Sequence, residues 1–255
     1  MFKKRFPLCA PQFSEDIYLG PAFAGNSAVS EGPSPMSVGV GPLGRVYIFD
    51  VVPLTLQAAG LAGSQNPASG GSFTLTAGTG VTTTVDATGT TRYVLDTPRA
   101  VTITAAGANT ATYLVSGYDQ YGQPMTELLA APSTSTVVTD KAFKSVISIT
   151  NANATLATNG LTAGFNDKLG LPVRVTDAGY IIHVGWAAAL ADDAGTFVAA
   201  DTTSPATTTT NDVRGVYTPS SAADGSRRLV MAIAVPALGC GPNATRVGAF
   251  GVTQV

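Results

Sequence analysis

The fold is decided by one stretch in the middle of the chain, Tyr113-Leu-Val-Ser-Gly-Tyr-Asp-Gln-Tyr-Gly-Gln-Pro-Met-Thr-Glu127. Two runs of β-forming residues flank the polar segment 119–123, and Gly122 can adopt the positive φ of a tight turn. Pro124 then opens the return run, a position in a strand that tolerates a missing amide donor. The stretch therefore predicts a β-hairpin.

Short strand patterns continue on both sides of this hairpin. The runs Val101-Thr-Ile-Thr104 and Val146-Ile-Ser-Ile149 alternate with the period of two that half-buried strands show. Turn residues separate such runs at intervals of roughly 8–12 residues, which is typical of β-sandwiches and barrels. The predicted strands are 45–52, 72–76, 81–85, 92–95, 101–104, 112–118, 126–129, 135–138, 144–150, 173–176, 180–186, 214–218, 228–235 and 248–255. Only 55–61 and 186–191 have patterns compatible with a helix, and both are short.

These patterns predict an all-β chain with an extended N-terminal arm. A length of 255 residues suits one large β domain or two small ones. Composition divides the chain into a Pro/Gly-rich arm at 1–45, a β-sandwich region at 46–165 and a second strand-rich region at 166–255. The region 166–255 can belong to the same domain as the region 46–165.

The arm has an unusual composition for a chain terminus. Proline and glycine alternate through it, so neither a long helix nor a central strand fits. Aromatic residues, which disordered tails usually lack, are spaced along it. Such an arm can wrap its own domain or reach a neighbouring subunit, where buried aromatic side chains dominate the binding energy. The candidate assembly anchors are therefore Phe2, Phe6, Phe13, Tyr18 and Phe23, with Arg5 and Arg45 as secondary candidates.

Charged residues are scarce in this sequence. They make up 12% of it, against the ~25% of an average globular protein. Two interpretations remain open: an uncharged, Thr-rich β protein, or a surface that is largely buried against other subunits. The net charge of −2 makes nucleic acid an unlikely partner. The sequence contains no run of 18 apolar residues, so we expect no membrane partner.

The two cysteines do not indicate a metal or redox site. Cys9 and Cys240 lie far apart, and neither belongs to a CxxC motif or a Cys/His cluster. Free thiols in a reducing compartment are the simplest expectation. The basic start of the chain resembles that of a signal peptide, but prolines and polar residues interrupt any apolar core, so no signal peptide is expected.

The sequence holds a single histidine, His183. In a regular strand, Tyr180, Ile182, Val184 and Trp186 would share one face, with Ile181 and His183 on the other. A lone histidine in such a place is more often a surface or interface residue than a catalytic one. No GxSxG motif is present to supply a nucleophile.

Other motifs are weak as well. Gly39-Val-Gly-Pro-Leu-Gly44 matches GxGxxG, but a strand pattern follows it where a dinucleotide site requires a helix. Asp192 and Asp193 could bind calcium if carbonyl groups converged on them, but a solvated acidic turn is the commoner arrangement. We therefore expect no catalytic, cofactor-binding or metal-binding residue, no small-molecule substrate and no enzymatic activity.

The sequence resembles virion structural proteins of tailed bacteriophages over most of its length, and six segments carry this resemblance most clearly. They are Pro11-Gln-Phe-Ser-Glu-Asp16, Gly41-Pro-Leu-Gly-Arg-Val-Tyr47, Arg92-Tyr-Val-Leu-Asp-Thr-Pro-Arg-Ala100, Gly117-Tyr-Asp-Gln-Tyr-Gly-Gln-Pro-Met-Thr-Glu127, Lys141-Ala-Phe-Lys-Ser-Val146 and Arg214-Gly-Val-Tyr-Thr-Pro-Ser-Ser-Ala-Ala-Asp-Gly225. The resemblance implies a capsid decoration or cement protein with a jelly-roll-like β-sandwich. It would be made in the host cytoplasm and located in the virion.

The expected function is to stabilise the head shell by bridging capsid subunits. The partners would then be the major capsid protein and copies of the chain itself in a homo-oligomer, with no cofactor. A first alternative is a structural protein of the tail, the collar or the head–tail connector. A second is a carbohydrate-binding module on the virion surface, with Trp186, the only tryptophan, as its aromatic platform.

Overall fold

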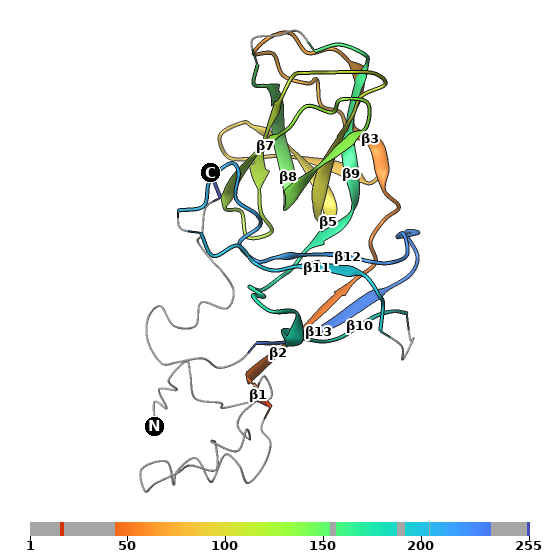
Figure 1. The fold of residues 1–255 in the computed structure, drawn as a ribbon, viewed down its shortest axis with the longest axis vertical. Coiled ribbons are helices and arrows are strands. Elements are labelled where there is room, and N and C mark those ends of the chain that lie inside the picture. Colours follow the sequence, from red (N-terminus) through yellow and green to blue (C-terminus); the bar gives the residue numbers. More distant parts are fainter. Residues whose placement is uncertain (1–15, 18–43, 154–156, 188–191, 204, 236–253) are drawn as a thin grey trace, which may run out of the picture.

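A computed structural model describes residues 16–17, 44–153, 157–187, 192–203, 205–235 and 254–255 (Figure 1). Within these residues the chain is nearly all β, as predicted, and its strands form two antiparallel sheets. The described helical structure is one short 3-10 turn, Ala178–Tyr180. The described residues contain no helix long and apolar enough to cross a membrane.

The smaller sheet has four strands. Their order is β1 (Asp16–Ile17), β2 (Gly44–Val51), β13 (Leu229–Val235) and β10 (Ile181–Trp186). Residues 49, 231 and 184 lie side by side across β2, β13 and β10. The sheet thus joins a strand of the predicted 46–165 region to two strands of the predicted 166–255 region.

The larger sheet has nine strands. Its main path runs through β11 (Thr196–Val198), β12 (Val216–Thr218), β9 (Leu161–Gly170), β5 (Thr91–Thr104), β8 (Thr136–Asn151), β6 (Tyr113–Tyr118) and β7 (Pro124–Leu129). Beside this path, β3 (Gln57–Gln65) pairs with β9, and β4 (Val81–Val85) pairs with β5. Strand β9 pairs with β3 and β5 along most of its length and with β12 at its last residues.

Two hydrophobic cores lie one above the other along the long axis of the molecule (Figure 1). The first core fills the curled part of the larger sheet and includes Tyr113, Phe143 and Phe165. The second core lies between the smaller sheet and the β11–β12 end of the larger one, with Phe49 and Met231 among its residues. The described chain is therefore an all-β sandwich whose two cores share strand β9.

The predicted hairpin is confirmed. Strands β6 and β7 pair from Tyr113↔Leu129 to Tyr118↔Pro124. The Asp119 amide donates to the carbonyl oxygen of Gln123 at 3.0 Å, and Gly122 has a φ of 76°.

Two pairs of predicted strands are each one long strand. The runs 92–95 and 101–104 both belong to β5, and the runs 135–138 and 144–150 both belong to β8. The pairing of β5 with β8 shifts register between Val94 and Arg99 and again between Ala100 and Thr102. Polar and charged residues interrupt the alternating pattern at these shifts. The sequence pattern therefore ends there, although the strand continues.

The segment 55–61, whose pattern is compatible with a helix, is not helical, because β3 occupies Gln57–Gln65. The strand β9 was not predicted, since Asn166, Asp167 and Lys168 hide its pattern. The segments 72–76 and 173–176 are not strands, although Ser72 forms an isolated bridge with Thr150. Residues 188–191 and 236–253 lie outside the described residues, so the segment 186–191, whose pattern is compatible with a helix, and the strand predicted at 248–255 fall mostly there.

Candidate assembly surface

The smaller sheet has one face on the second core and an opposite face that is largely apolar. In β2, Tyr47, Phe49 and Val51 pack in or against the second core, while Ile48 between them is 61% exposed. Ile182 in β10 is 50% exposed. The side chains on this second face, called here the outer face, are Val46, Ile48, Asp50, Ile182, His183, Val230, Ala232 and Ala234, of which Ala234 is buried.

Cross-strand pairing brings these apolar residues together. Ile48 lies opposite Ala232, and Ala232 lies opposite His183 on its other side. Exposed apolar side chains are common singly, but a contiguous group on a rigid sheet is typical of a contact site. The outer face is therefore a candidate assembly surface.

Polar pairs lie at the border of the outer face. Arg228 forms an exposed ion pair with both carboxylate oxygens of Asp50, and this hydrogen bonding lowers the pKa of Asp50. His183 Nδ1 lies 2.6 Å from Asp192 Oδ1. Polar groups around an apolar centre are the usual arrangement of a protein–protein interface.

The predicted facing of residues in 180–186 is corrected. The pairing of β10 with β13 shifts register between Ile181 and His183, which indicates a β-bulge. Ile182 is therefore exposed, whereas Val184 and Trp186 are buried. Tyr180 precedes the strand, in the 3-10 turn.

Trp186 does not form an open aromatic platform. Its exposed fraction is 9%, and it belongs to the second core. The guanidinium of Arg227 lies over its ring, 4.6 Å from the ring centroid. The ring face that a sugar would require is thus occupied by the chain itself.

The predicted arm anchors lie almost entirely outside the described residues. Phe2, Arg5, Phe6, Phe13, Tyr18 and Phe23 are all in this group. The backbone of Arg45 belongs to β2 and is paired with Asp16 on one side and Val235 on the other. Cys9 and Cys240 also lie outside the described residues.

The acidic pair Asp192–Asp193 is engaged by the chain. Asp193 accepts hydrogen bonds from the Tyr217 hydroxyl at 2.7 Å and the Ser220 amide at 2.9 Å. Desolvation and the neighbouring Asp193 carboxylate raise the pKa of Tyr217. No group of three or more His, Cys, Asp or Glu residues in the described part of the chain could hold a metal ion.

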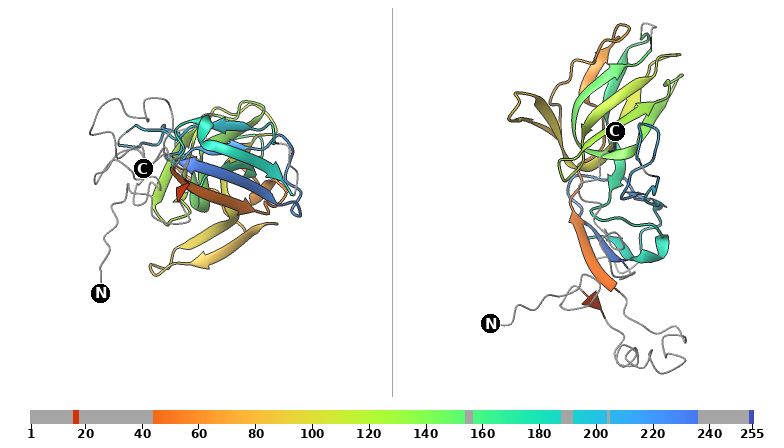
Figure 2. Two further views of the ribbon diagram at one scale, coloured as in Figure 1. Left: turned by 90° about the horizontal axis from the view of Figure 1, so that it is seen from below. Right: turned by 90° about the vertical axis from the view of Figure 1, so that its left-hand side faces the viewer.

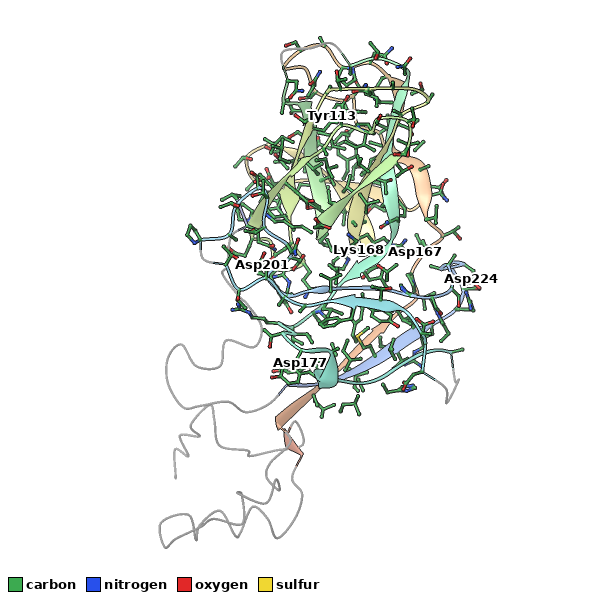
Figure 3. The ribbon with its side chains drawn as sticks, in the orientation of Figure 1. Tyr113, Asp167, Lys168, Asp177, Asp201 and Asp224 are labelled. Carbon is green, nitrogen blue, oxygen red and sulfur yellow. The ribbon has the colours of Figure 1, made fainter. Side chains whose placement is uncertain are left out.

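Buried charged residues, which the sequence analysis did not identify, hold the strands and loops beside these surfaces in position. Arg99 in β5 is fully buried at the junction of the two cores. Its guanidinium donates to the carboxylates of Asp96 at 2.8 Å and Asp167 at 3.3 Å and to the carbonyl oxygen of Leu54 at 2.5 Å. Asp167, labelled in Figure 3, also accepts the Ala223 amide, while burial raises its pKa.

A second buried pair links the hairpin to the segment before β12. Arg214 Nη1 donates to Asp119 Oδ2 at 2.7 Å, and both side chains are nearly inaccessible. Asp212 accepts the amides of Arg214 and Ala142 through its two oxygens. Burial raises the pKa of Asp212.

Beside this pair, Lys141 is fully buried, and its partners among the described residues are backbone oxygens. Its ammonium donates to the carbonyls of Thr126 at 2.7 Å, Thr207 at 2.5 Å and Gln254 at 3.0 Å. The Glu127 carboxylate accepts the amides of residues 140 and 141. Burial raises the pKa of Glu127 to about 7 and lowers that of Lys141.

Comparisons of the chain with protein-family models, with curated proteins and with solved structures found no match.

Proposed function

We propose that this chain is a structural protein of a tailed-phage capsid, a decoration protein that binds the assembled head and bridges its subunits. The observation that carries the proposal is the outer face of the smaller sheet, where Ile48 of β2 and Ile182 of β10 are exposed on the two strands that flank β13, while the opposite face packs on the second core. The sequence segments that resemble phage virion proteins and the low share of charged residues support the same proposal.

The rigidity of the sheet makes this face suitable for docking. Its inner side is held by Phe49, Leu229 and Met231, all of which are less than 10% exposed. A surface that is already ordered loses little conformational entropy on binding, so more of the contact energy remains as affinity. We infer that the outer face meets the capsid shell as a preformed unit.

A decoration protein stabilises the shell by mass action. It binds the assembled state and not the separated subunits, so each site contributes RT ln(1 + [L]/Kd), or about 2.7 kcal/mol at a hundredfold excess over Kd. Many sites around one shell add up. The proposal therefore requires neither a catalytic centre nor a cofactor.

The test compares phage heads that lack this protein with heads to which purified protein has been added back. Depleted heads are expected to have normal geometry but to break at a lower temperature, and added protein is expected to restore their resistance. Ile48→Lys should abolish the rescue, because it places a charge in the centre of the outer face.

Leu128→Lys provides the matched control. Leu128 is 41% exposed on β7 of the larger sheet, away from the outer face, so this variant should rescue normally. Depleted heads that resist heat as well as complete ones would contradict the proposal. A copy number of about a dozen per virion instead of hundreds would favour the connector alternative.

A further inference from the structure

Strand β4 and the first residues of β5 form a hairpin that projects from the body of the larger sheet (Figure 2). The two strands pair from Val81↔Leu95 to Val85↔Thr91. No other strand of the described chain pairs with the second edge of β4. Residues 82–85 are all exposed, and Val85 has 67% of its surface open to solvent.

The turn of this hairpin determines which backbone groups face outward. The Asp86 amide donates to the carbonyl oxygen of Thr90 at 3.0 Å, and Gly89, with a φ of 83°, donates to the carbonyl oxygen of Asp86. Hydrogen-bonded and non-hydrogen-bonded pairs alternate along an antiparallel ladder. Asp86 and Thr90 form a hydrogen-bonded pair, so Val85 and Thr83 belong to non-hydrogen-bonded pairs with β5. The amide and carbonyl groups of Thr83 and Val85 therefore point away from β5.

Another edge of the same sheet is covered within the chain, whereas this one is not. On β7 the amides of Thr126 and Leu128 donate to the carbonyl oxygens of Gln254 at 2.8 Å and Thr208 at 2.9 Å. Natural proteins also protect free edges with proline, charged side chains or bulges. The five residues of β4 include neither a proline nor a charged side chain.

The sequence of β4 is compatible with pairing to a copy of itself. Val81-Thr-Thr-Thr-Val85 reads the same in both directions. Placed antiparallel to a copy of itself, Thr83 meets Thr83 and Val81 meets Val85, so the outward amides of Thr83 and Val85 both find carbonyl acceptors. We propose that β4 pairs with β4 of a second copy of this chain about a two-fold axis, which joins the two larger sheets into one.

The charges next to the strand are compatible with this pairing. In the same register Asp86 falls opposite Gly80, so no like charges meet. The Asp86 carboxylate is also paired within its own chain, 3.0 Å from Arg92. The contact is self-complementary and closes at two copies, so it does not propagate into a filament.

The contact is small, which sets its strength. Five paired residues bury less than the ~1,000 Å² that a stable interface usually requires, so we expect association in the micromolar to millimolar range. Copies held near one another on a common support would pair much more readily. The proposed pairing requires only a second copy of the chain, and it does not depend on the capsid proposal.

Sedimentation equilibrium of the full chain over a concentration series tests the pairing. The wild type should be a reversible dimer. Thr83→Pro removes the outward donor at the two-fold axis and leaves the bonds to β5, so dimerisation should weaken by roughly tenfold or more. Thr91→Pro is the matched control on the opposite edge of the same hairpin and should dimerise normally.

A cross-linking experiment provides a second readout, and it needs no proline. In a Cys9→Ser, Cys240→Ser background, Thr83→Cys should form an intermolecular disulfide under mild oxidation much faster than Thr88→Cys, because the two hairpin tips lie far apart in the dimer. If Thr83→Pro unfolds, Thr83→Lys replaces it, since two lysines facing each other should also prevent pairing. A monomeric wild type, or equal cross-linking at residues 83 and 88, would overturn the inference.

Discussion

Single charged residues hold loops of this molecule at defined positions. Arg99, Lys141 and Arg214 are each at least 98% buried. Arg99 and Lys141 each bond to groups on two or more separate segments, and Arg214 bonds to Asp119 in the hairpin turn. A buried charge is expensive unless its donors are satisfied, so such residues favour one arrangement of the chain over alternatives. In a protein that acts by contact, this rigidity keeps the exposed faces and edges in a fixed geometry.

Glu127 should make the stability of the fold depend on pH near neutrality. Burial raises its pKa from 4.5 to about 7. Between these values the folded state holds more protons than the unfolded state, so the stabilisation present below pH 4.5 is lost as the pH rises through 7. The difference amounts to about 3 kcal/mol.

Urea unfolding of the wild type and Glu127→Gln at a series of pH values from acid to neutral checks this expectation. The glutamine keeps one acceptor oxygen for the amides of residues 140 and 141 and cannot ionise, so its unfolding free energy should fall less steeply over this range. Parallel curves for the two proteins would show that Glu127 has the same pKa in the folded and unfolded states, and would contradict the expectation.

Among the elements, β3 and β9 depend on an unusually close contact. A Cβ atom on Gly164 would lie 1.8 Å from the carbonyl oxygen of Gln57, which is a backbone atom that cannot move cheaply. Gly164→Ala should therefore destabilise the protein by about 1–3 kcal/mol or more. Gly63→Ala, in β3 itself, meets no atom within 4 Å and serves as the control. Equal midpoints of thermal unfolding for the two variants would contradict the close contact.

Element boundaries in the sequence were obscured by the same charged residues that stabilise the structure. The predicted pairs of runs in β5 and β8 are separated by the gaps that contain Arg99 and Lys141. Ala100 and Ala142, which follow them, pair directly across the two strands. A charged residue in such a gap normally indicates a turn, and only the tertiary contacts of the two side chains show that each strand continues.

The sequence alone could predict an all-β molecule, its hairpin and most of its strands, because these depend on local patterns. The pairing of β2 with β13 could not be predicted, since it joins residues nearly two hundred positions apart. The outer face depends on that pairing and on the bulge in β10. The predicted aromatic anchors of the arm remain a prediction.

At the scale of the whole molecule, the two cores should unfold together. Strand β9 contributes Phe165 to the first core and Leu169 to the second, and the Arg99 cluster connects segments beside both. Trp186, the only tryptophan, reports on the second core, whereas far-UV circular dichroism reports on all strands. For the wild type, the two signals should give coincident denaturation curves.

Arg99→Ala should separate the two curves. The substitution leaves Asp96 and Asp167 without their buried cation and releases the carbonyl of Leu54, so the contact between the cores weakens more than either core itself. The Trp186 signal should then change at lower denaturant than the circular dichroism, because the second core is the smaller one. Arg92→Ala, on the projecting hairpin, should keep the curves together. If the two curves are already separate in the wild type, β9 does not couple the two cores. If they coincide in Arg99→Ala, β9 couples the two cores without Arg99.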